Sequence, residues 1–427
     1  LNWGCIPTKA LLRTADIYDL FHRAEEFGLK ADNIGFDLDA VVKRSRKVAG
    51  RLSSGVTMLM KKHKIDVIEG EARLEKGAKA PNVIVKGEGG ETGYAADHVI
   101  LATGARARTL PKAGLEPDGK HIWTYKEAMV PEAMPESLLV IGSGAIGMEF
   151  ASFYDAMGAD VTVVERVDRI LPAEDAEISA FAEKAFKKRG VTLHTEAQVS
   201  GLTSGKAGVK AQLALKSGKT ETIQVDKVIL AIGITGNVEG LGLDGLGVEI
   251  ERGHVVADGF GRTGVAGLYA IGDVTGAPWL AHKASHEGVI CVEAIAGQTP
   301  HPMDKSNIPG CTYCHPQVAS VGLTEDQARD AGYDLKVGRF PFVGNGKAIA
   351  LGEDQGLVKT IFDAKTGELL GAHMVGAEVT ELIQGYAVGK TLETTEAELM
   401  HTIFPHPTLS EMMHESVLDA YDRVIHI

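Results

Sequence analysis

One segment of the chain, residues 137–165, restricts the possible folds more than any other. An apolar strand is followed there by glycines with the spacing G-x-G-x-x-G, then by a helix and a second strand. The strands are Ser137–Ile141 and Val161–Glu165, the helix is Met148–Phe153, and the glycine loop contains Gly142, Gly144, Ala145, Ile146 and Gly147. In this motif the glycines allow a tight turn, close approach of a pyrophosphate and helix–strand packing. The order predicts a dinucleotide-binding βαβ unit, although a glycine-rich turn that only packs a structural helix is the alternative.

Glu165 bears on which dinucleotide such a unit would bind. A carboxylate at the end of the second strand can accept a hydrogen bond from the 2′-hydroxyl of the adenosine ribose, and it repels a 2′-phosphate. The sequence therefore favours NAD over NADP. Arg166 and Arg169 lie close by and keep NADP open as the less favoured alternative.

A repeated strand indicates a second domain of similar kind. The segments Asp97–Gly104 and Asp226–Gly233 are both apolar runs closed by glycine, which is typical of parallel strands covered on both faces. Chance similarity of two short apolar strands is the alternative. The first copy has no G-x-G-x-x-G ahead of it, and a βαβ unit takes about 30 or more residues. We therefore expect a piece of that size upstream of Leu1.

Size and composition exclude several classes of protein. The 427 residues suggest two to four domains, and a net charge of −13 argues against a basic nucleic-acid-binding face. No apolar run is long enough to predict a membrane span. Four cysteines form no disulfide scaffold and favour a reducing compartment. No targeting pattern is visible, but an upstream targeting segment stays open, and we expect no metal site.

Two separate motifs contain residue types suited to redox and proton chemistry. Cys5 is followed by Ile6-Pro7 and then Lys9, although most lone cysteines are inert small hydrophobes. His406 lies between two prolines that stiffen its backbone, which suits a general base. Glu411 could orient the imidazole, but Thr408-x-x-Glu411 is also a capping box, and Glu411 could serve both roles.

Three other features carry weaker signals. The strand that begins at Leu268 ends in Gly-Asp at Asp273, which could otherwise be a turn residue or helix N-cap. A helix opens within Trp279–Ala284, where His282 is favoured as a packing or backbone-contact residue. Cys311 and Cys314 form a single C-x-x-C in a predicted strand and turn. A structural role is favoured for this pair, and Cys291 is predicted to be a core residue.

Taken together, the chain resembles the dihydrolipoamide dehydrogenases, the E3 components of 2-oxo acid dehydrogenase complexes. The resemblance runs from Asn2-x-Gly4-Cys5-Ile6-Pro7-x-Lys9, through Ala281-His282-Lys283 and residues 318–325, to His406-Pro407-Thr408-x-Ser410-Glu411. Glutathione and mercuric reductases share this framework. The chain lacks the paired C-terminal cysteines of mercuric reductases, and Glu165 disfavours the NADP preference usual in glutathione reductases. Cys311 and Cys314 depart from the commoner single-cysteine version.

The resemblance implies an α/β fold with two Rossmann-like domains and a C-terminal α+β dimer-interface domain. The implied divisions are an FAD domain over residues 1–118, incomplete at its N-terminus, an NAD domain over 119–236, a central domain over 237–306 and an interface domain over 307–427. Homodimerisation would bring His406 to Cys5 of the partner subunit.

The resemblance also implies the residue roles. Cys5 would be the second cysteine of a redox disulfide, with the first immediately before Leu1, and His406 with Glu411 would take the proton of the dihydrolipoamide thiol. Lys9 would lie near the flavin and pair with Glu149. The remaining FAD contacts would be Ala72, Thr103, Gly104, Ala105, Asp273, Leu280, Ala281 and His282. NAD would be held by Gly142, Gly144, Ala145, Ile146, Gly147, Glu165, Val199 and Gly233.

The expected partner is a lipoyl domain of an E2 protein or of a glycine-cleavage protein, in the cytoplasm of a bacterium or the mitochondrial matrix of a eukaryote. Two alternatives stay open: another flavin disulfide reductase, and a non-catalytic NAD-binding piece. We expect a chain that starts at Leu1 not to turn over dihydrolipoamide, because Cys5 lacks its partner and the flavin lacks its first phosphate loop. Such a chain should still bind NADH if it folds.

Overall fold

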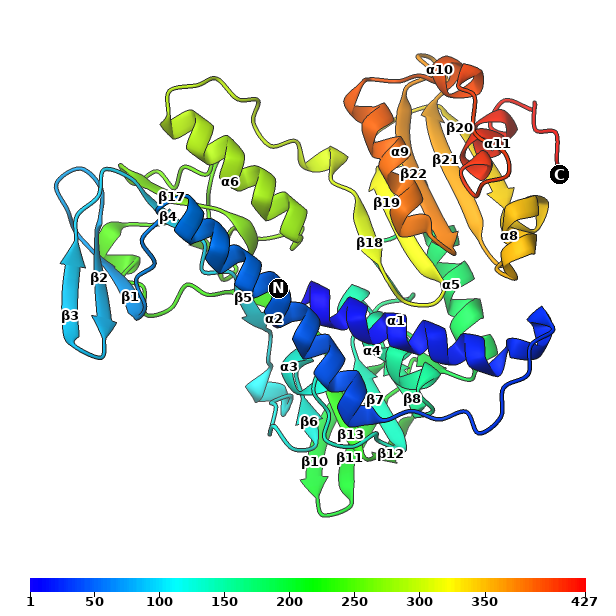
Figure 1. Ribbon diagram of the computed structural model, residues 1–427, viewed down its shortest axis with the longest axis horizontal. Helices are drawn as coiled ribbons and strands as arrows, with labels where there is room; N and C mark the ends of the chain where they lie inside the picture. Colours follow the sequence, from blue (N-terminus) through cyan, green and yellow to red (C-terminus); the bar gives the residue numbers. More distant parts are fainter. The chain divides into compact units, whose positions relative to one another are not determined.

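A computed structural model describes residues 1–427, and contacts divide the chain into two compact units (Figure 1). Unit 1 comprises Leu1–Ser54, Thr109–Ile232 and Ser306–Ile427, and unit 2 comprises Gly55–Arg108 and Gly233–Lys305. Each unit is described by itself. The division into four domains expected from the sequence stays a prediction.

Unit 1 contains a five-stranded parallel sheet in the order β6-β13-β7-β8-β9. Its strands are β6 (Ile122–Trp123), β13 (Lys227–Leu230), β7 (Ser137–Ile141), β8 (Asp160–Val164) and β9 (Thr192–His194). Leu138, Leu139 and Val140 are all fully buried, because a parallel sheet covered on both faces needs apolar side chains in both directions. Helix α4 (Ala145–Ala156) connects β7 to β8, so the predicted βαβ unit and the α/β fold class are confirmed.

Helix α1 (Cys5–His22) packs against α4 in the same unit (Figure 1). Leu11 and Leu12 of α1 join Phe150 and Phe153 of α4 in one buried cluster. The apolar face of α1 therefore anchors its first turn, which carries the candidate redox cysteine, to the βαβ unit.

An antiparallel sheet of three strands and a short helix complete this part of unit 1. They are β10 (Gln198–Gly205), β11 (Gly208–Ala214), β12 (Thr220–Val225) and α3 (Tyr125–Ala128). Val209 and Leu213 of β11 share a buried cluster with Leu139 and Ile141, so the small sheet closes one side of the parallel sheet.

The C-terminal sheet of unit 1 is antiparallel, in the order β18-β19-β22-β21-β20. Its strands are β18 (Gly310–Thr312), β19 (Gln317–Gly322), β20 (Leu335–Pro341), β21 (Leu357–Asp363) and β22 (Leu369–Gly376), and its helices are α7 (Glu325–Asp330), α8 (Gly346–Leu351), α9 (Val379–Thr391), α10 (Glu396–His401) and α11 (Glu411–Asp419). Side chains alternate along a strand. Val358, Phe362 and Met374 share the buried cluster that includes residues of α9 and α11, whereas α5 (Ala176–Arg189) packs against β22.

Unit 2 contains several small sheets and helix α6 (Ala281–Ile295). Strand β4 (Val99–Leu101) pairs in parallel with β17 (Leu268–Ala270). The other strands are β1 (Glu71–Glu75), β2 (Asn82–Gly87) and β3 (Gly90–Tyr94) in one antiparallel sheet, β5 (Ala105–Ala107) with β14 (Ile234–Gly236), and β15 (Ile250–Glu251) with β16 (His254–Val255). The two strands that repeat in the sequence, β4 and β13, are thus both parallel strands.

Helix α2 (Leu38–Lys62) starts in unit 1 and ends in unit 2. Short 3₁₀ helices are η1 (Ala24–Phe27), η2 (Pro111–Ala113), η3 (Asp244–Leu246), η4 (Gly272–Thr275), η5 (Lys305–Asn307) and η6 (Phe342–Gly344). None of the helices combines the length and apolar character needed to cross a lipid bilayer.

Candidate active site

The glycine loop between β7 and α4 is closed by backbone on one side and open on the other. A Cβ atom on Gly142 would lie 2.4 Å from the carbonyl oxygen of Ala231, and one on Gly147 would lie 2.0 Å from that of Gly142. A Cβ on Gly144 would meet nothing within 4 Å. The first and third glycines therefore serve packing, and the second leaves room beside the backbone for a ligand.

The N-terminus of α4 is free to bind an anion. Its N-cap is Gly144, so no side chain caps the helix, and Ala145 and Ile146 in the first turn are exposed. The first N–H groups of a helix have no partner within it. Together with the helix dipole, they form a site that fits the pyrophosphate of a dinucleotide.

Glu165 folds back onto this loop. One of its carboxylate oxygens accepts hydrogen bonds from the amide (2.9 Å) and hydroxyl (2.8 Å) of Ser143, and the other accepts from the amide of Val167 at 3.1 Å. A carboxylate has about four acceptor sites, so Glu165 keeps the capacity to accept from a ribose hydroxyl. Nearby, Arg169 pairs with Asp168 at 3.2 Å.

Two other residues predicted to bind NAD lie in different settings. Val199 of β10 is 2% exposed and belongs to the core, so only its backbone could face a ligand. Gly233 follows β13 with φ of +103°, and its carbonyl accepts from the amide of Arg108 at 3.0 Å. Gly233 belongs to unit 2. Both roles stay predictions.

Cys5 is the first residue of α1, and its side chain is exposed. The N-cap is Gly4, whose carbonyl accepts from the hydroxyl of Thr8 at 2.8 Å, and no side chain caps the helix. The positive end of the helix dipole therefore faces the sulfur and stabilises negative charge there. This position suits a cysteine that takes part in thiol–disulfide exchange.

Lys9 lies one turn further along α1 and forms the predicted pair with Glu149. Its ammonium is 2.8 and 2.9 Å from the two carboxylate oxygens of Glu149, which is almost fully buried. The amide of Tyr313 donates to the same carboxylate at 3.0 Å, and the ammonium lies 4.5 Å from the centre of the Tyr313 ring. Carboxylate and ring together hold a cation in a fixed position.

His406 and Glu411 form a second ionisable pair. The Nδ1 atom of His406 is 2.9 Å from one oxygen of Glu411, and the imidazole is 80% exposed. The other oxygen of Glu411 accepts from the amide of Thr408 at 2.9 Å. Partial burial acts against the charge of Glu411, but the hydrogen bonds from Thr408 and His406 outweigh it and lower the pKa of this carboxyl.

Only half of the predicted capping box is formed around this pair. Helix α11 begins at Glu411 with Ser410 as its N-cap, and the hydroxyl of Thr408 donates to the carbonyl of Pro405 at 2.6 Å instead of capping the helix. Glu411 therefore binds the Thr408 amide with one carboxylate oxygen and the His406 imidazole with the other. The buried amide of Asn345 donates to the Thr408 carbonyl at 3.0 Å and holds the loop in place.

In unit 2, the end of β4 is clamped by Asn237. The Thr103 hydroxyl donates to the Asn237 carbonyl at 2.8 Å, and the Asn237 side chain donates back to the Thr103 carbonyl at 2.8 Å. The Asn237 amide also donates to the carbonyl of Gly104 at 2.9 Å. Thr103 is exposed, and Ala105 begins β5. Their contact with FAD stays a prediction.

Asp273 lies in a turn that a buried lysine stabilises. The ammonium of Lys283 donates to the carbonyls of Gly272 (3.2 Å) and Gly276 (3.1 Å) and pairs with Glu287 at 3.0 Å. Burial, opposed by the charge of Lys283, raises the pKa of Asp273. The turn thus presents a carboxyl group that could interact with a polar ligand.

The N-terminus of α6 is also uncapped. Leu280 is its N-cap, no side chain caps it, and Ala281 and His282 in the first turn are exposed. Its first amides fit an electron-rich or anionic group. Ala72 is exposed on β1. The FAD roles of these four residues stay predictions.

The other three cysteines occupy protected positions. Cys291 and Cys314 are buried, and Cys311 is half-buried. Burial raises the pKa of Cys311 to about 11 and raises that of Cys314 as well, so both stay protonated and are poor nucleophiles. No group of three or more His, Cys, Asp or Glu side chains could hold a metal ion.

The structure brings some predicted residues together and keeps others apart. Lys9 and Glu149 meet at the first turns of α1 and α4, and His406 meets Glu411, but no hydrogen bond or ion pair joins the two groups. The sequence interpretation missed Tyr313, Lys283 and Asn345. Lys283 could have been recognised as a charge in an apolar helix, since buried lysines need partners. Tyr313 and Asn345 act through contacts far apart in sequence that carry no local signal.

Two family models match the chain. Residues 1–288 match the pyridine nucleotide-disulphide oxidoreductase family, and residues 308–417 match the dimerisation domain of the same family. The first match covers the parallel sheet and the first half of α6, and the second covers all five strands of the C-terminal sheet.

Several known proteins similar to the chain are dihydrolipoyl dehydrogenases. The chain is 60% identical to a dihydrolipoyl dehydrogenase of Rhizobium etli, over 100% of this chain and 91% of the relative, and 58% identical to one of Zymomonas mobilis over the same shares. A crystal structure of LpdA from Mycobacterium tuberculosis superimposes with a TM-score of 0.90 at 29% identity, covering 97% of this chain and 90% of that one.

Proposed function

Because the chain belongs to the pyridine nucleotide-disulphide oxidoreductase family, we propose that it is a dihydrolipoyl dehydrogenase, which oxidises protein-bound dihydrolipoamide to lipoamide and reduces NAD⁺. The observation that carries this function is the agreement with dihydrolipoyl dehydrogenases over the whole chain. The exposed Cys5 on its helix terminus and the His406–Glu411 pair support it, since they supply the sulfur and the base that oxidation of a dithiol requires.

The family uses FAD and NAD(H), and the residues present fit both. The open glycine loop from Gly142 to Gly147, with Glu165 beside it, would hold NAD. In unit 2, the turn at Asp273 and the uncapped start of α6 would bind parts of FAD. The flavin role of the Lys9–Glu149 pair in unit 1 stays an implication of the family resemblance. When bound, FAD carries electrons from the dithiol to the nicotinamide.

His406 would act as the general base toward the substrate thiol. Glu411 keeps a charged carboxylate next to Nδ1, so that nitrogen carries the proton of the neutral ring and Nε2 is the free acceptor. Transfer of the thiol proton to Nε2 creates an imidazolium, which the carboxylate stabilises. Because His406 is exposed, a substrate thiol can approach its ring.

Cys5 and Lys9 would act on the other side of the exchange. Cys5 would supply one sulfur of the redox pair, and the dipole of α1 stabilises the thiolate that leaves when its disulfide is attacked. Lys9, fixed by Glu149 and Tyr313, would hold a positive charge near the site where negative charge accumulates.

We further propose that the enzyme is a homodimer whose substrate is the lipoyl domain of a 2-oxo acid dehydrogenase E2 or a glycine-cleavage protein. The match of residues 308–417 to the family's dimerisation domain supports the dimer. Within one chain, no hydrogen bond or ion pair joins His406 to the region of Cys5 and Lys9, which fits a site shared between two copies. We also propose a cytoplasmic location, which fractionation of the native host tests.

Reduction of NAD⁺ by dihydrolipoamide in the complete gene product tests the function. The purified protein should show flavin absorbance, and dihydrolipoamide should drive NADH formation. Glutathione disulfide and Hg²⁺ should be poor oxidants of NADH or NADPH in the same preparation. A flavin-loaded protein that reduces either of them faster than it oxidises dihydrolipoamide would contradict the proposal.

A further inference from the structure

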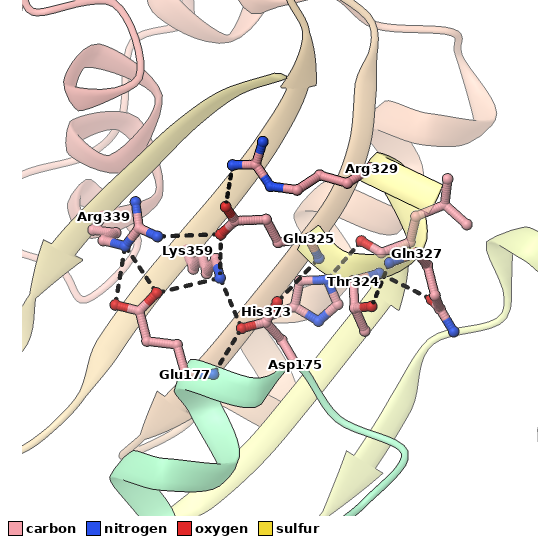
Figure 2. Close-up of polar contacts among 10 residues, drawn as sticks. Asp175, Glu177, Thr324, Glu325, Gln327, Arg329, Arg339, Lys359 and His373 are labelled. Carbon is pink, nitrogen blue, oxygen red and sulfur yellow. Dashed lines mark hydrogen bonds and ion pairs between the residues drawn. The ribbon is translucent and has the colours of Figure 1, made fainter. Parts of the chain in front are cut away.

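A row of polar side chains crosses the C-terminal sheet. Ser320 of β19 lies opposite His373 of β22, His373 opposite Lys359 of β21, and Lys359 opposite Arg339 of β20. Residues directly opposite each other on neighbouring strands point to the same face of a sheet. We call these four residues the polar row. Its central members face the start of α5, which belongs to the dinucleotide-binding part of unit 1 (Figure 2).

Lys359 is the most buried member of the polar row to carry a charge. Its side chain is 3% exposed, and its ammonium lies 2.8 Å from Asp175, 3.2 Å from Glu177 and 2.8 Å from Glu325 (Figure 2). Burial disfavours the ammonium, but Asp175 and Glu325 outweigh it and raise the pKa of Lys359. For the same reason the pKa of Asp175 is lowered despite its burial. Both groups are therefore charged at neutral pH.

The surrounding side chains balance these charges. Arg339 binds both oxygens of Glu177, at 3.0 and 2.8 Å, and lies 3.2 Å from Glu325, which also pairs with Arg329 at 2.6 Å. Three cations thus face three carboxylates. His373, fully buried between them, stays neutral because burial lowers its pKa, and its Nε2 lies 2.8 Å from the carbonyl of Leu323.

A continuous chain of contacts leads from Lys359 to the glycine loop. Asp175 is the N-cap of α5 and accepts from the amide of Glu177 at 3.0 Å. One turn into α5, the Ser179 hydroxyl donates to the carbonyl of Leu171 at 3.0 Å, and the amide of Leu171 donates to the carbonyl of Ser143 at 2.9 Å. Ser143 is the residue between the first two loop glycines, and its amide and hydroxyl hold Glu165.

The backbone of Leu171 makes the contact path from Lys359 to Ser143 depend on where α5 begins. It has φ of +46°, a left-handed conformation that a leucine adopts only when its surroundings impose it. Buried Ile170 and Ile178 pack beside it. The start of α5 therefore has to lie in one place for Leu171 to support Ser143, and Lys359 fixes that place through Asp175.

We propose that Lys359 is a positioning residue for the dinucleotide: it ties the C-terminal sheet to the start of α5 and thereby holds Ser143 and Glu165 in the geometry that binds NAD(H). A buried ion pair is weak evidence for stability alone, since apolar residues of the same volume often stabilise as well. The Lys359–Asp175 pair, at 2.8 Å, adds a fixed distance between the C-terminal sheet and the start of α5. The inference rests on the proposed function only in that NAD(H) is the ligand.

The test measures NADH binding and the dithiol reaction separately in the flavin-loaded complete gene product. In Lys359→Met, we expect the Kd for NADH to rise about tenfold, while reduction of the flavin by dihydrolipoamide without NAD⁺ stays within about twofold of wild type. Lys359→Arg keeps the charge and should restore Kd to within about threefold. Arg23→Met serves as the matched control, because it breaks an ion pair with Glu353 at 2.8 Å that is not on the path, and it should leave Kd unchanged.

Each outcome decides the proposal. If Lys359→Met does not fold, Asp175→Asn keeps an N-cap acceptor, removes the charge and should raise Kd about threefold. An unchanged Kd in a folded variant overturns the proposal, and so does an equal loss in NADH binding and in flavin reduction, since that result shows a general structural defect. Failure of the wild type to oxidise dihydrolipoamide would reject the proposed function, but NADH titration would still decide the role of Lys359.

Discussion

Two pairs of ionisable side chains, His406–Glu411 and Lys359–Asp175, differ in how many hydrogen-bonding positions they leave free. His406–Glu411 and Lys359–Asp175 have nearly equal distances, 2.9 and 2.8 Å. The histidine is 80% exposed and has one ring nitrogen without a partner in the chain, whereas the lysine is 3% exposed and meets three carboxylates. A group that exchanges protons with a substrate needs a free acceptor, and a group that fixes a distance needs saturated partners. The His406–Glu411 pair is therefore suited to proton transfer, and the Lys359–Asp175 pair is suited to holding two elements at a fixed distance.

The cysteines repeat this difference. Cys5 is exposed at a helix N-terminus, while Cys314 is buried and its thiol donates to the carbonyl of Pro316 at 3.2 Å. Burial raises the pKa of Cys314, so the thiolate needed for exchange does not form there. An open environment again marks the residue suited to chemistry.

Replacing His406, the proposed base of the exposed His406–Glu411 pair, should have the largest effect on turnover. We expect His406→Gln to lower the turnover of dihydrolipoamide by about 10² or more, the scale of a lost general base. Flavin content and NADH affinity should not change, since His406 contacts neither candidate cofactor region. Steady-state kinetics with matched flavin loading measures this, and a loss of less than about threefold would reduce His406 to a structural residue.

The carboxylate of Glu165, which can still accept a hydrogen bond, should determine the preference for NAD⁺ over NADP⁺. We expect kcat/KM for NAD⁺ to exceed that for NADP⁺ by about 10- to 10³-fold. Glu165→Ala should narrow the ratio, because it removes both the acceptor and the repulsion of a 2′-phosphate. Kinetics with both dinucleotides on wild type and variant checks this, and equal efficiency in the wild type would refute the assignment.

The buried Lys359–Asp175 pair should contribute to the free energy of unfolding by an amount that depends on pH. A carboxyl with a lowered pKa stabilises the fold above its unfolded pKa of about 3.9, and this contribution is lost as the pH falls through the lowered value. Lys359→Met removes the partner of Asp175, so it should lower the melting temperature by a similar amount from pH 7 to about pH 5, and by progressively less as the pH falls through about 4 and below. Thermal unfolding at several pH values measures this. A melting-temperature loss that grows on acidification would contradict the charge assignment.

Changes at the buried and half-buried cysteines should have the smallest effect on turnover. Cys311→Ala should change turnover by less than about twofold, because its thiol is protonated and half-buried. Brief alkylation of the reduced native enzyme, followed by mass spectrometry, should label Cys5 and leave Cys314 unmodified. Rapid labelling of Cys314 would erase the distinction between open and protected thiols.

Local patterns predicted the parts of this molecule that are close in sequence. The strand–glycine loop–helix–strand order predicted β7, α4 and β8, and the motif around His406 predicted a contact between its imidazole and Glu411 that the structure contains. The Lys9–Glu149 pair came from the family resemblance, not from spacing. The polar row could not be predicted, since it depends on the register of strands and on the placement of α5, which no local pattern reports. The burial of Val199 escaped notice for the same reason.

The claim that two copies share one reaction centre is tested most directly by mixing inactive variants. Cys5→Ser and His406→Gln homodimers carrying different affinity tags would be allowed to exchange subunits, and heterodimers bearing both tags would be purified. If His406 serves Cys5 of the partner subunit, each heterodimer regains one intact site of two, about half of the wild-type turnover. Heterodimers as inactive as either parent would contradict the account and show that both residues act within one chain.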